Sequence, residues 1–169
     1  GGNGVGAQNI NHVAINFIRD PGFNPFVAIA PKFLFVESHI AVPGGHTVGK
    51  NGIVASGYVE GVDFDQADAT TLNAALNLLG VPGGYSALVI ASDFGGIFTQ
   101  AELDILNGRQ ASIAAFLNAG GGLYAMAESN SGAHLTPGGG QYAYIPTIVS
   151  AVNVDQSEVG NTVTPFGAG

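Results

Sequence analysis

Residues 85–130 read YSALVIASDFGGIFTQAELDILNGRQASIAAFLNAGGGLYAMAESN, and this stretch decides the fold. Residues 87–91 (ALVIA) form a continuous apolar run with β-branched side chains, which is typical of a strand covered on both faces. A helical segment follows, and after three glycines residues 123–127 (LYAMA) predict the next strand. A strand–helix–strand unit of this length is expected to be a parallel, right-handed crossover.

The helix of this unit is predicted to begin at Thr99. Thr99 and Glu102 fit a capping box, in which the hydroxyl and the carboxylate each bind a free amide of the first turn. The apolar residues that follow fall on one face at helical spacing: Leu103, Leu106, Ile113 and Leu117, with Gln110 interrupting them. Asn107-Gly108 predicts a kink or a split into two helices, because an interior Gly costs about 1 kcal/mol relative to Ala.

The order of these elements resembles the core of the class I glutamine amidotransferase-like superfamily, especially its trehalose-utilisation-type branch. There a Tyr-led strand, a helix and a Gly-Gly-Gly-Leu strand follow one another, as Tyr85 and residues 120–123 do here. Residues 33–167 are also similar to uncharacterised secreted bacterial proteins with this domain. The resemblance implies an α/β fold, a three-layer, flavodoxin-like arrangement around a parallel sheet, in one domain over residues 32–169.

The same resemblance implies that amidotransferase chemistry is absent. The family nucleophile is a Cys on a tight turn after a strand, and its position falls at about Ala127. The family also has a His-x-Glu pair late in the chain, whereas His134 is the last histidine here and no His-x-Glu occurs. We therefore expect no glutamine hydrolysis, and we assign no cofactor.

The composition limits the classes of partner. The chain has 169 residues, of which 46% are hydrophobic, so one domain with a sizeable core is expected. Four Lys and Arg residues against a net charge of −8 exclude nucleic acid and anionic membranes, which need clustered cations. The absence of Cys excludes disulfides, thiolate zinc sites and a Cys nucleophile. No apolar run approaches the roughly 20 residues that span a bilayer.

The low charge content also suggests where the protein works. Only 9% of the residues are charged, against about 25% in typical soluble proteins, and 27 are Gly. This composition favours a secreted, extracellular or cell-surface protein whose surface is covered by copies of itself, as in a filament. The chain begins with Gly1 rather than Met, which fits either a removed leader or a fragment.

The first 31 residues are predicted to hold a glycine-rich segment and an extra strand. At 12–17, Val13, Ile15 and Phe17 alternate with Ala14 and Asn16, as in a half-buried strand. The usual order of the fold has no place for it. It could form an edge of the same sheet, or it could be an assembly strand that joins a neighbouring subunit's sheet.

Four further elements are expected along the chain: a first core strand at 33–37, a weak strand at 53–59, a helix at 65–80 and a candidate last strand at 151–154. Asp65 or Asp68 is expected to cap the helix, and Gly80 to end it.

Polar side chains follow three of the strands, and the carboxyl ends of parallel strands meet at one edge, where ligands bind. They are Glu37, Ser38, His39, Ser92, Asp93, Glu128 and Ser129. One interpretation is a hydrolase with Ser129 or Ser38 as nucleophile, His39 as base, and Asp93 or Glu37 orienting it. The other is that these groups cap loops and helix amides, which the absence of a Gly-x-Ser-x-Gly motif favours.

Other clusters give weaker signals. Glu37, His39 and His46 supply three metal ligands without a fourth. The aspartates at 63, 65 and 68 lack the Gly and distal Glu of a calcium loop, so we assign no metal site. Tyr142, Tyr144 and Phe166 could form a sugar platform or simply pack on the sheet. The sequence thus favours a non-catalytic structural or interaction role, with a hydrolase or carbohydrate-acting enzyme, or a small-molecule or glycan-binding module, as the alternatives.

Overall fold

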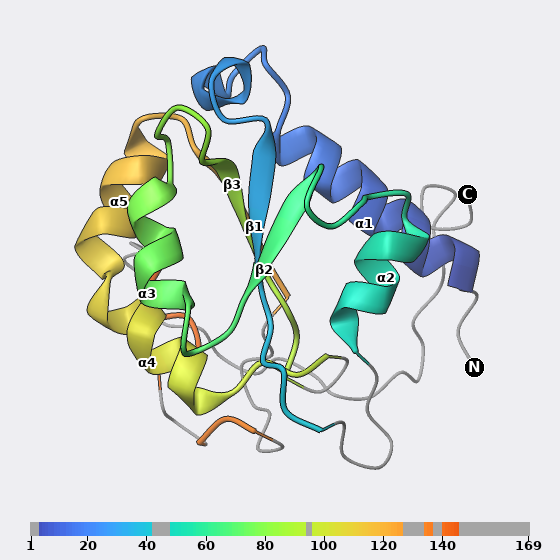
Figure 1. Cartoon of the computed structure of the whole chain (residues 1–169), viewed down its shortest axis with the longest axis vertical. Helices are drawn as coiled ribbons and strands as arrows, with labels where there is room; N and C mark the ends of the chain where they lie inside the picture. Colours follow the sequence, from blue (N-terminus) through green and yellow to red (C-terminus); the bar gives the residue numbers. More distant parts are fainter. Residues whose placement is uncertain (1–3, 42–47, 94–95, 127–133, 137–139, 146–169) are drawn as a thin grey trace, which may run out of the picture.

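The computed structural model describes residues 4–41, 48–93, 96–126, 134–136 and 140–145. These residues form three layers, with a parallel sheet between helices on both of its faces (Figure 1). Helices α1 and α2 lie on one side, and α3, α4 and α5 lie on the other. The predicted three-layer α/β architecture is therefore confirmed.

The sheet of the described part of the chain has four strands in the order β2-β1-β3-β4, and every neighbouring pair is parallel. Their bounds are Lys32–Val36 for β1, Phe64–Ala67 for β2, Tyr85–Ile90 for β3 and Gly122–Ala125 for β4. The strands predicted at 33–37, 87–91 and 123–127 are thus confirmed, with ends shifted by one or two residues. The central strands β1 and β3 are almost wholly buried, which explains their continuous apolar sequences.

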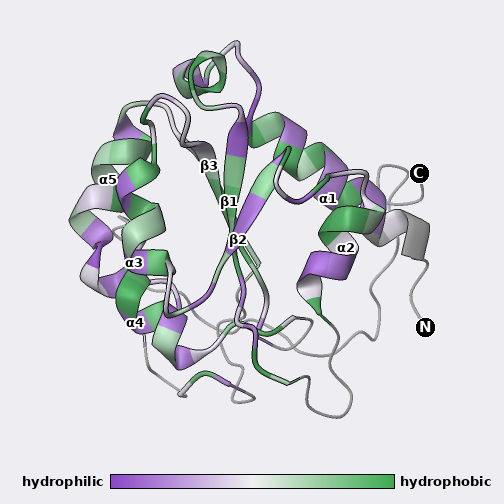
Figure 2. Cartoon of the chain, viewed as in Figure 1, coloured by the Kyte–Doolittle hydropathy of each residue, from purple (hydrophilic) through white to green (hydrophobic). Residues whose placement is uncertain are grey.

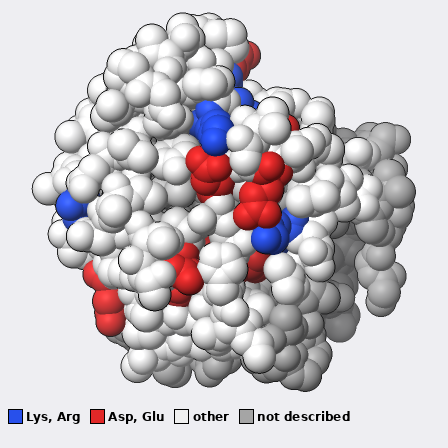
Figure 3. All heavy atoms as spheres, viewed as in Figure 1, with Lys and Arg blue, Asp and Glu red and all other residues white. Residues whose placement is uncertain are grey.

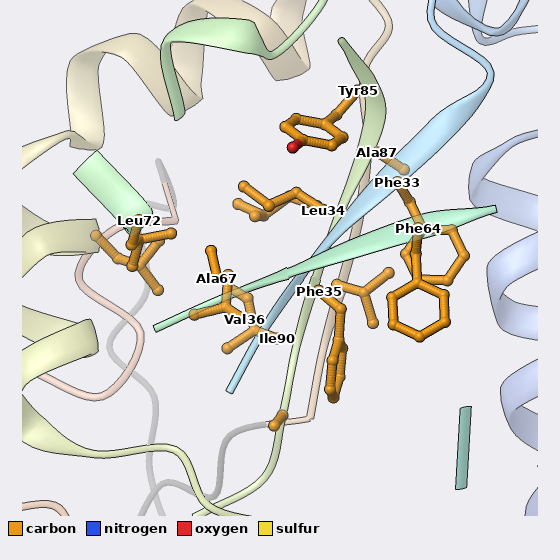
Figure 4. Close-up of a cluster of buried hydrophobic side chains, with 14 of the residues drawn as sticks. Phe33, Leu34, Phe35, Val36, Phe64, Ala67, Leu72, Tyr85, Ala87 and Ile90 are labelled. Atoms are coloured by element: carbon orange, nitrogen blue, oxygen red, sulfur yellow. The ribbon is translucent and has the colours of Figure 1, made fainter. Parts of the chain in front are cut away.

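Side chains of successive strand residues leave the sheet on opposite faces and build a core on each. Figure 4 shows Phe33, Phe35 and Phe64 on the side of α1 and α2, and Leu34 and Tyr85 on the side of α3. The Phe33 and Phe64 rings stack with centroids 5.2 Å apart, as their direct pairing across β1 and β2 requires. Figure 2 shows that hydrophobic residues are interspersed with hydrophilic ones along every helix, so each helix has a face for one of these cores.

The helical crossover between β3 and β4 matches its prediction in detail. It consists of α4 (Gln100–Gly108) and α5 (Gln110–Asn118), so the split expected at Gly108 is present. The capping box is also present, with Thr99 N donating to Glu102 Oε2 at 3.0 Å. Leu103, Leu106 and Ile113 are fully buried, in agreement with the predicted apolar face.

The strand predicted at 12–17 is wrong, because these residues belong to helix α1, Gly4–Ile18. Ile15 is fully buried, whereas Val13 is 43% and Phe17 is 65% exposed, so the three residues do not share one face. The alternation covers only six residues, and Ile10, Val13 and Phe17 are at helical spacing as well. The packing of α1 against β4 and α2 favours the helix over the strand.

Two further predictions between β1 and β3 are wrong. Residues 53–59 were expected to form a strand, but α2 spans Gly49–Ala55. The segment 65–80 was expected to be one helix, but it begins in strand β2, and the helical part is short: α3 at Leu72–Ala75, then the 3₁₀ helix η2 at Leu76–Leu78. Another 3₁₀ helix, η1, covers Pro25–Ala28.

The aspartates at the start of that segment have different roles. Asp65 lies in β2 and pairs with Lys32 Nζ at 3.0 Å, so it caps no helix. Asp68 accepts the amide of Thr70 at 3.0 Å and that of Thr71 at 3.3 Å, and so begins the turn before α3. The strand expected at 151–154 lies outside the described residues.

Candidate functional site at the carboxyl edge of the sheet

The connection from β2 to β3 crosses over β1, so the direction of the strand order reverses between β1 and β3. In open parallel sheets, ligands bind at such a reversal, in the crevice beyond the strand ends. Glu37 directly follows β1, and Asp93 lies three residues after the end of β3. Both side chains are fully buried. The structure therefore brings two of the predicted acids to the same edge.

Glu37 is engaged by backbone amides. Its Oε1 accepts from Gly49 N at 2.6 Å and from Ile97 N at 3.1 Å, and its Oε2 accepts from Lys50 N at 2.9 Å. The carboxylate thus lies at the N-terminus of α2, where free amides favour a negative charge. A Cβ on Gly49 would lie 2.6 Å from Oε1, so this contact requires Gly there. Glu37 is a structural anchor in this arrangement.

The crevice beside Glu37 is filled by the chain itself. Ser38 N donates to Ile97 O at 2.8 Å, and Phe98 N donates to Ser92 O at 3.2 Å. Ile97 and Phe98 are 1% and 0% exposed. The segment that leads into α4 therefore occupies the place between the β1 and β3 ends where a ligand would bind in other sheets of this kind.

Asp93 pairs with His134, a contact that the sequence did not predict. Asp93 Oδ1 accepts from His134 N at 2.7 Å and lies 2.9 Å from His134 Nδ1, which is 3.1 Å from Asp93 O. Because both partners of Nδ1 are acceptors, this nitrogen carries the proton. The His134 side chain is 9% exposed. A buried acid that fixes the tautomer of an imidazole is the arrangement found in Ser-His-Asp enzymes.

His39 pairs with a different acid, Asp68. Its Nδ1 is 2.9 Å from Asp68 Oδ2, and its side chain is 54% exposed. Hydrogen bonds from the Thr70 hydroxyl and then from His39 lower the pKa of Asp68. The base predicted for a hydrolase is therefore oriented by Asp68 and not by Glu37 or Asp93. Glu128, Ser129 and His46 lie outside the described residues.

A third buried acid, Glu102, was expected only as part of the capping box. Its Oε1 also accepts from Ala69 N at 2.9 Å, and the side chain is 1% exposed. This bond ties the turn after β2 to the start of α4. The sequence holds no local sign of it, because residues 69 and 102 are distant along the chain.

The remaining candidate groups have structural partners. Asp63 accepts from Val59 N at 2.8 Å, and among the described residues no three His, Asp or Glu side chains lie together as a metal site would require. Tyr144 is fully buried, and this burial raises its pKa, so it packs in the core and does not form an open sugar platform. Phe166 lies outside the described residues. Within the described ranges no helix has the length and apolar character to cross a bilayer.

Comparisons with known proteins assign no family to this chain. No protein-family model matches it, and neither a curated protein nor a solved structure does.

Proposed function

We propose that this chain is a non-catalytic, secreted α/β domain of the glutamine amidotransferase-like type, with a structural or interaction role in an extracellular assembly of its own copies. The observation that supports this proposal is that the chain itself fills the crevice between the ends of β1 and β3, where the strand order reverses. Both oxygens of Glu37 are bound by backbone amides, and residues 96–98 fill the space beside it. An acid that orients a catalytic base must bind that base, but among the described residues both Glu37 oxygens bind backbone amides and His39 binds Asp68 instead.

The surface supports an interaction role. Several large apolar side chains are at least 40% exposed: Ile10, Val13, Phe17, Phe23, Ile29, Ile40, Val54, Val59, Val62, Leu78 and Val81. Figure 3 shows few charged side chains on the face in view, with acidic and basic ones close together near its centre. Two ion pairs, Lys32–Asp65 and Lys50–Glu60, neutralise part of the surface charge. Exposed apolar side chains mark a binding surface where they gather into one contiguous patch.

The test is the size of the purified full chain in solution. Sedimentation velocity over a hundredfold range of concentration, with electron micrographs of the same samples, is expected to show dimers and larger particles or filaments. A single monomer peak at every concentration would overturn the proposal.

The pairing of Asp93 with His134 favours a second candidate function, a hydrolase. In that case His134 would be the base, oriented by Asp93 at 2.9 Å, and a serine at this edge would be the nucleophile. A fluorophosphonate probe, which reacts with activated serines, tests it. Labelling that is lost in His134→Ala and retained in His39→Ala would support the hydrolase. A chain that stays unlabelled would contradict it.

A further inference from the structure

Helix α1 presents an apolar stripe to solvent. Ile10, Val13 and Phe17 follow one another at intervals of three and four residues, so they lie on one side of the helix. They are 46%, 43% and 65% exposed, while Ile15, on the opposite side, is fully buried against the core. The stripe is therefore the outer face of a helix whose inner face is already packed.

The stripe continues into an apolar hollow. The ring of Phe23, 51% exposed, lies 5.0 Å from that of Phe17 between centroids. Beside them is a hollow of about 300 Å³. It is lined by Phe17, Ile18, Phe23, Leu123 and the glycines at 120, 121 and 122. We call the three stripe residues, Phe23 and this hollow the α1 face.

The charge distribution indicates what covers the α1 face. No Asp, Glu, Lys or Arg occurs in the 15 residues of α1, and none of the described residues that line the hollow is charged. Of the two charged residues that directly follow α1 in the sequence, Arg19 is turned towards Pro31 O and lies over the Phe33 ring at 5.5 Å, and Asp20 accepts from Gly22 N at 2.7 Å. The whole chain carries −8, so two copies repel each other. Contact through the α1 face brings no carboxylates of that helix against each other.

The shape of the α1 face also suits a second copy. The exposed aromatic rings of Phe17 and Phe23 stand beside the hollow, which three consecutive glycines help to line. In a two-fold contact each copy supplies the same surface, so a projecting ring needs a recess on an identical surface. Aromatic side chains in apolar recesses contribute most to such contacts.

We propose that two copies of this chain bind through the α1 face in a two-fold contact, α1 against α1, with aromatic rings of each copy packed into the hollow of the other. This inference rests on the proposed self-association and specifies its surface.

Charge substitutions test the surface. Phe17→Glu places a carboxylate at the centre of the contact in both copies, and we expect the dimer dissociation constant in sedimentation velocity to rise at least tenfold. The matched control is Val62→Glu, which introduces the same charge at a side chain that is 67% exposed and lies outside the α1 face. It should leave the dissociation constant within twofold. Equal weakening by both variants would overturn the assignment to the α1 face. Circular dichroism and urea unfolding verify that both variants fold.

Cross-linking gives an independent test, because the chain contains no Cys. Val13→Cys is expected to form a covalent dimer under mild oxidation, and Val62→Cys is expected to stay monomeric on denaturing gels. If copies associate but Phe17→Glu associates normally and Val13→Cys does not cross-link, the α1 face is wrong while self-association stands. If the unmodified chain never associates, the proposed function fails as well.

Discussion

A buried carboxylate is unfavourable unless hydrogen bonds replace its water, and Glu37 receives three of them from main-chain amides. It joins the end of β1 to the start of α2 and to the segment before α4. These contacts join parts of the chain that are distant in sequence, so local secondary-structure propensities could not predict them. Glu37, one of the two acids predicted to orient the base of a hydrolase, thus has a stabilising role.

Replacement of Glu37 tests this role. Glu37→Ala removes the acceptor of the buried amide of Ile97 and of the part-buried amides of Gly49 and Lys50, so the free energy of unfolding should fall by about 3 kcal/mol or more. Urea unfolding followed by circular dichroism measures it. The control Glu60→Ala, whose carboxylate pairs with Lys50 at the surface, should change stability by less than about 1 kcal/mol. Equal effects would contradict the anchor role.

The lowered pKa of Asp68 should make the stability of the fold depend on pH. Its pKa is lowered in the folded chain by the Thr70 hydroxyl and then by His39, relative to about 4 in the unfolded chain. A lowered folded-state pKa means that the carboxylate stabilises the fold above pH 4 and that this contribution is lost as the pH falls further. Asp68→Asn should therefore lose less stability between pH 4 and pH 2 than the unmodified chain does. Thermal unfolding at several pH values measures the difference, and parallel curves would contradict it.

Part of the site could be predicted residue by residue. The strand-end rule located Glu37 and Asp93, because it depends on local apolar runs whose carboxyl ends meet at one edge. It could not supply their partners. His134 is 41 residues from Asp93, and no spacing motif connects them. His39 was assigned to the wrong acid because its true partner, Asp68, belongs to the turn after β2.

Among the elements, those with complete local signals were predicted and those decided by tertiary contacts were not. The α4 helix has its capping box and apolar stripe in its own sequence, and β3 has an unbroken apolar run. By contrast, Val48 at the N-cap of α2 makes no side-chain hydrogen bond, and Glu37 supplies the acceptor from another element. The residues of β2 are half polar, since it forms one edge of the described sheet, and they therefore resembled a helix start.

Two glycines at element boundaries should respond oppositely to Ala. A Cβ on Gly108 would meet nothing within 4 Å, so Gly108→Ala should stabilise the fold by about 0.5–1 kcal/mol. A Cβ on Gly122 would lie 2.2 Å from Ile18 O, where α1 meets β4, so Gly122→Ala should destabilise it by about 1–3 kcal/mol. Urea unfolding of both variants measures the two effects, and a shift in the same direction would contradict the packing described here.

For the whole molecule, the finding that residues 4–18 form a helix and not the predicted strand gives the N-terminal segment a different role. Ile15 is part of the core, Asn11 Oδ1 accepts from Tyr124 OH at 3.0 Å, and Tyr58 OH donates to Asn16 Oδ1 at 2.9 Å. The segment is therefore one of the layers that cover the sheet. Its exposed side remains available to a partner.

Removal of residues 1–18 should consequently abolish cooperative unfolding. Without α1, the core on that face of the sheet opens to water, and the shortened chain should bind a hydrophobic dye and aggregate. Phe17→Glu, which alters only the exposed side of the same helix, should keep a cooperative transition. Dye fluorescence and thermal unfolding compare the two, and a well-folded monomer after deletion would show that α1 is dispensable.

The shared carboxylate of Glu37 also links the motions of two connections. Gly49 and Lys50 begin α2, at the end of the connection from β1, Ile97 lies in the connection before α4, and all three amides rely on the same pair of oxygens. Neither connection can lift from the sheet without depriving the acid of solvating amides, so they should open in one step. Deuterium uptake at these three amides should accordingly proceed at a common rate, and Glu37→Gln should accelerate it at all of them. The start of α2 and the segment before α4 would then open and close as one cooperative unit.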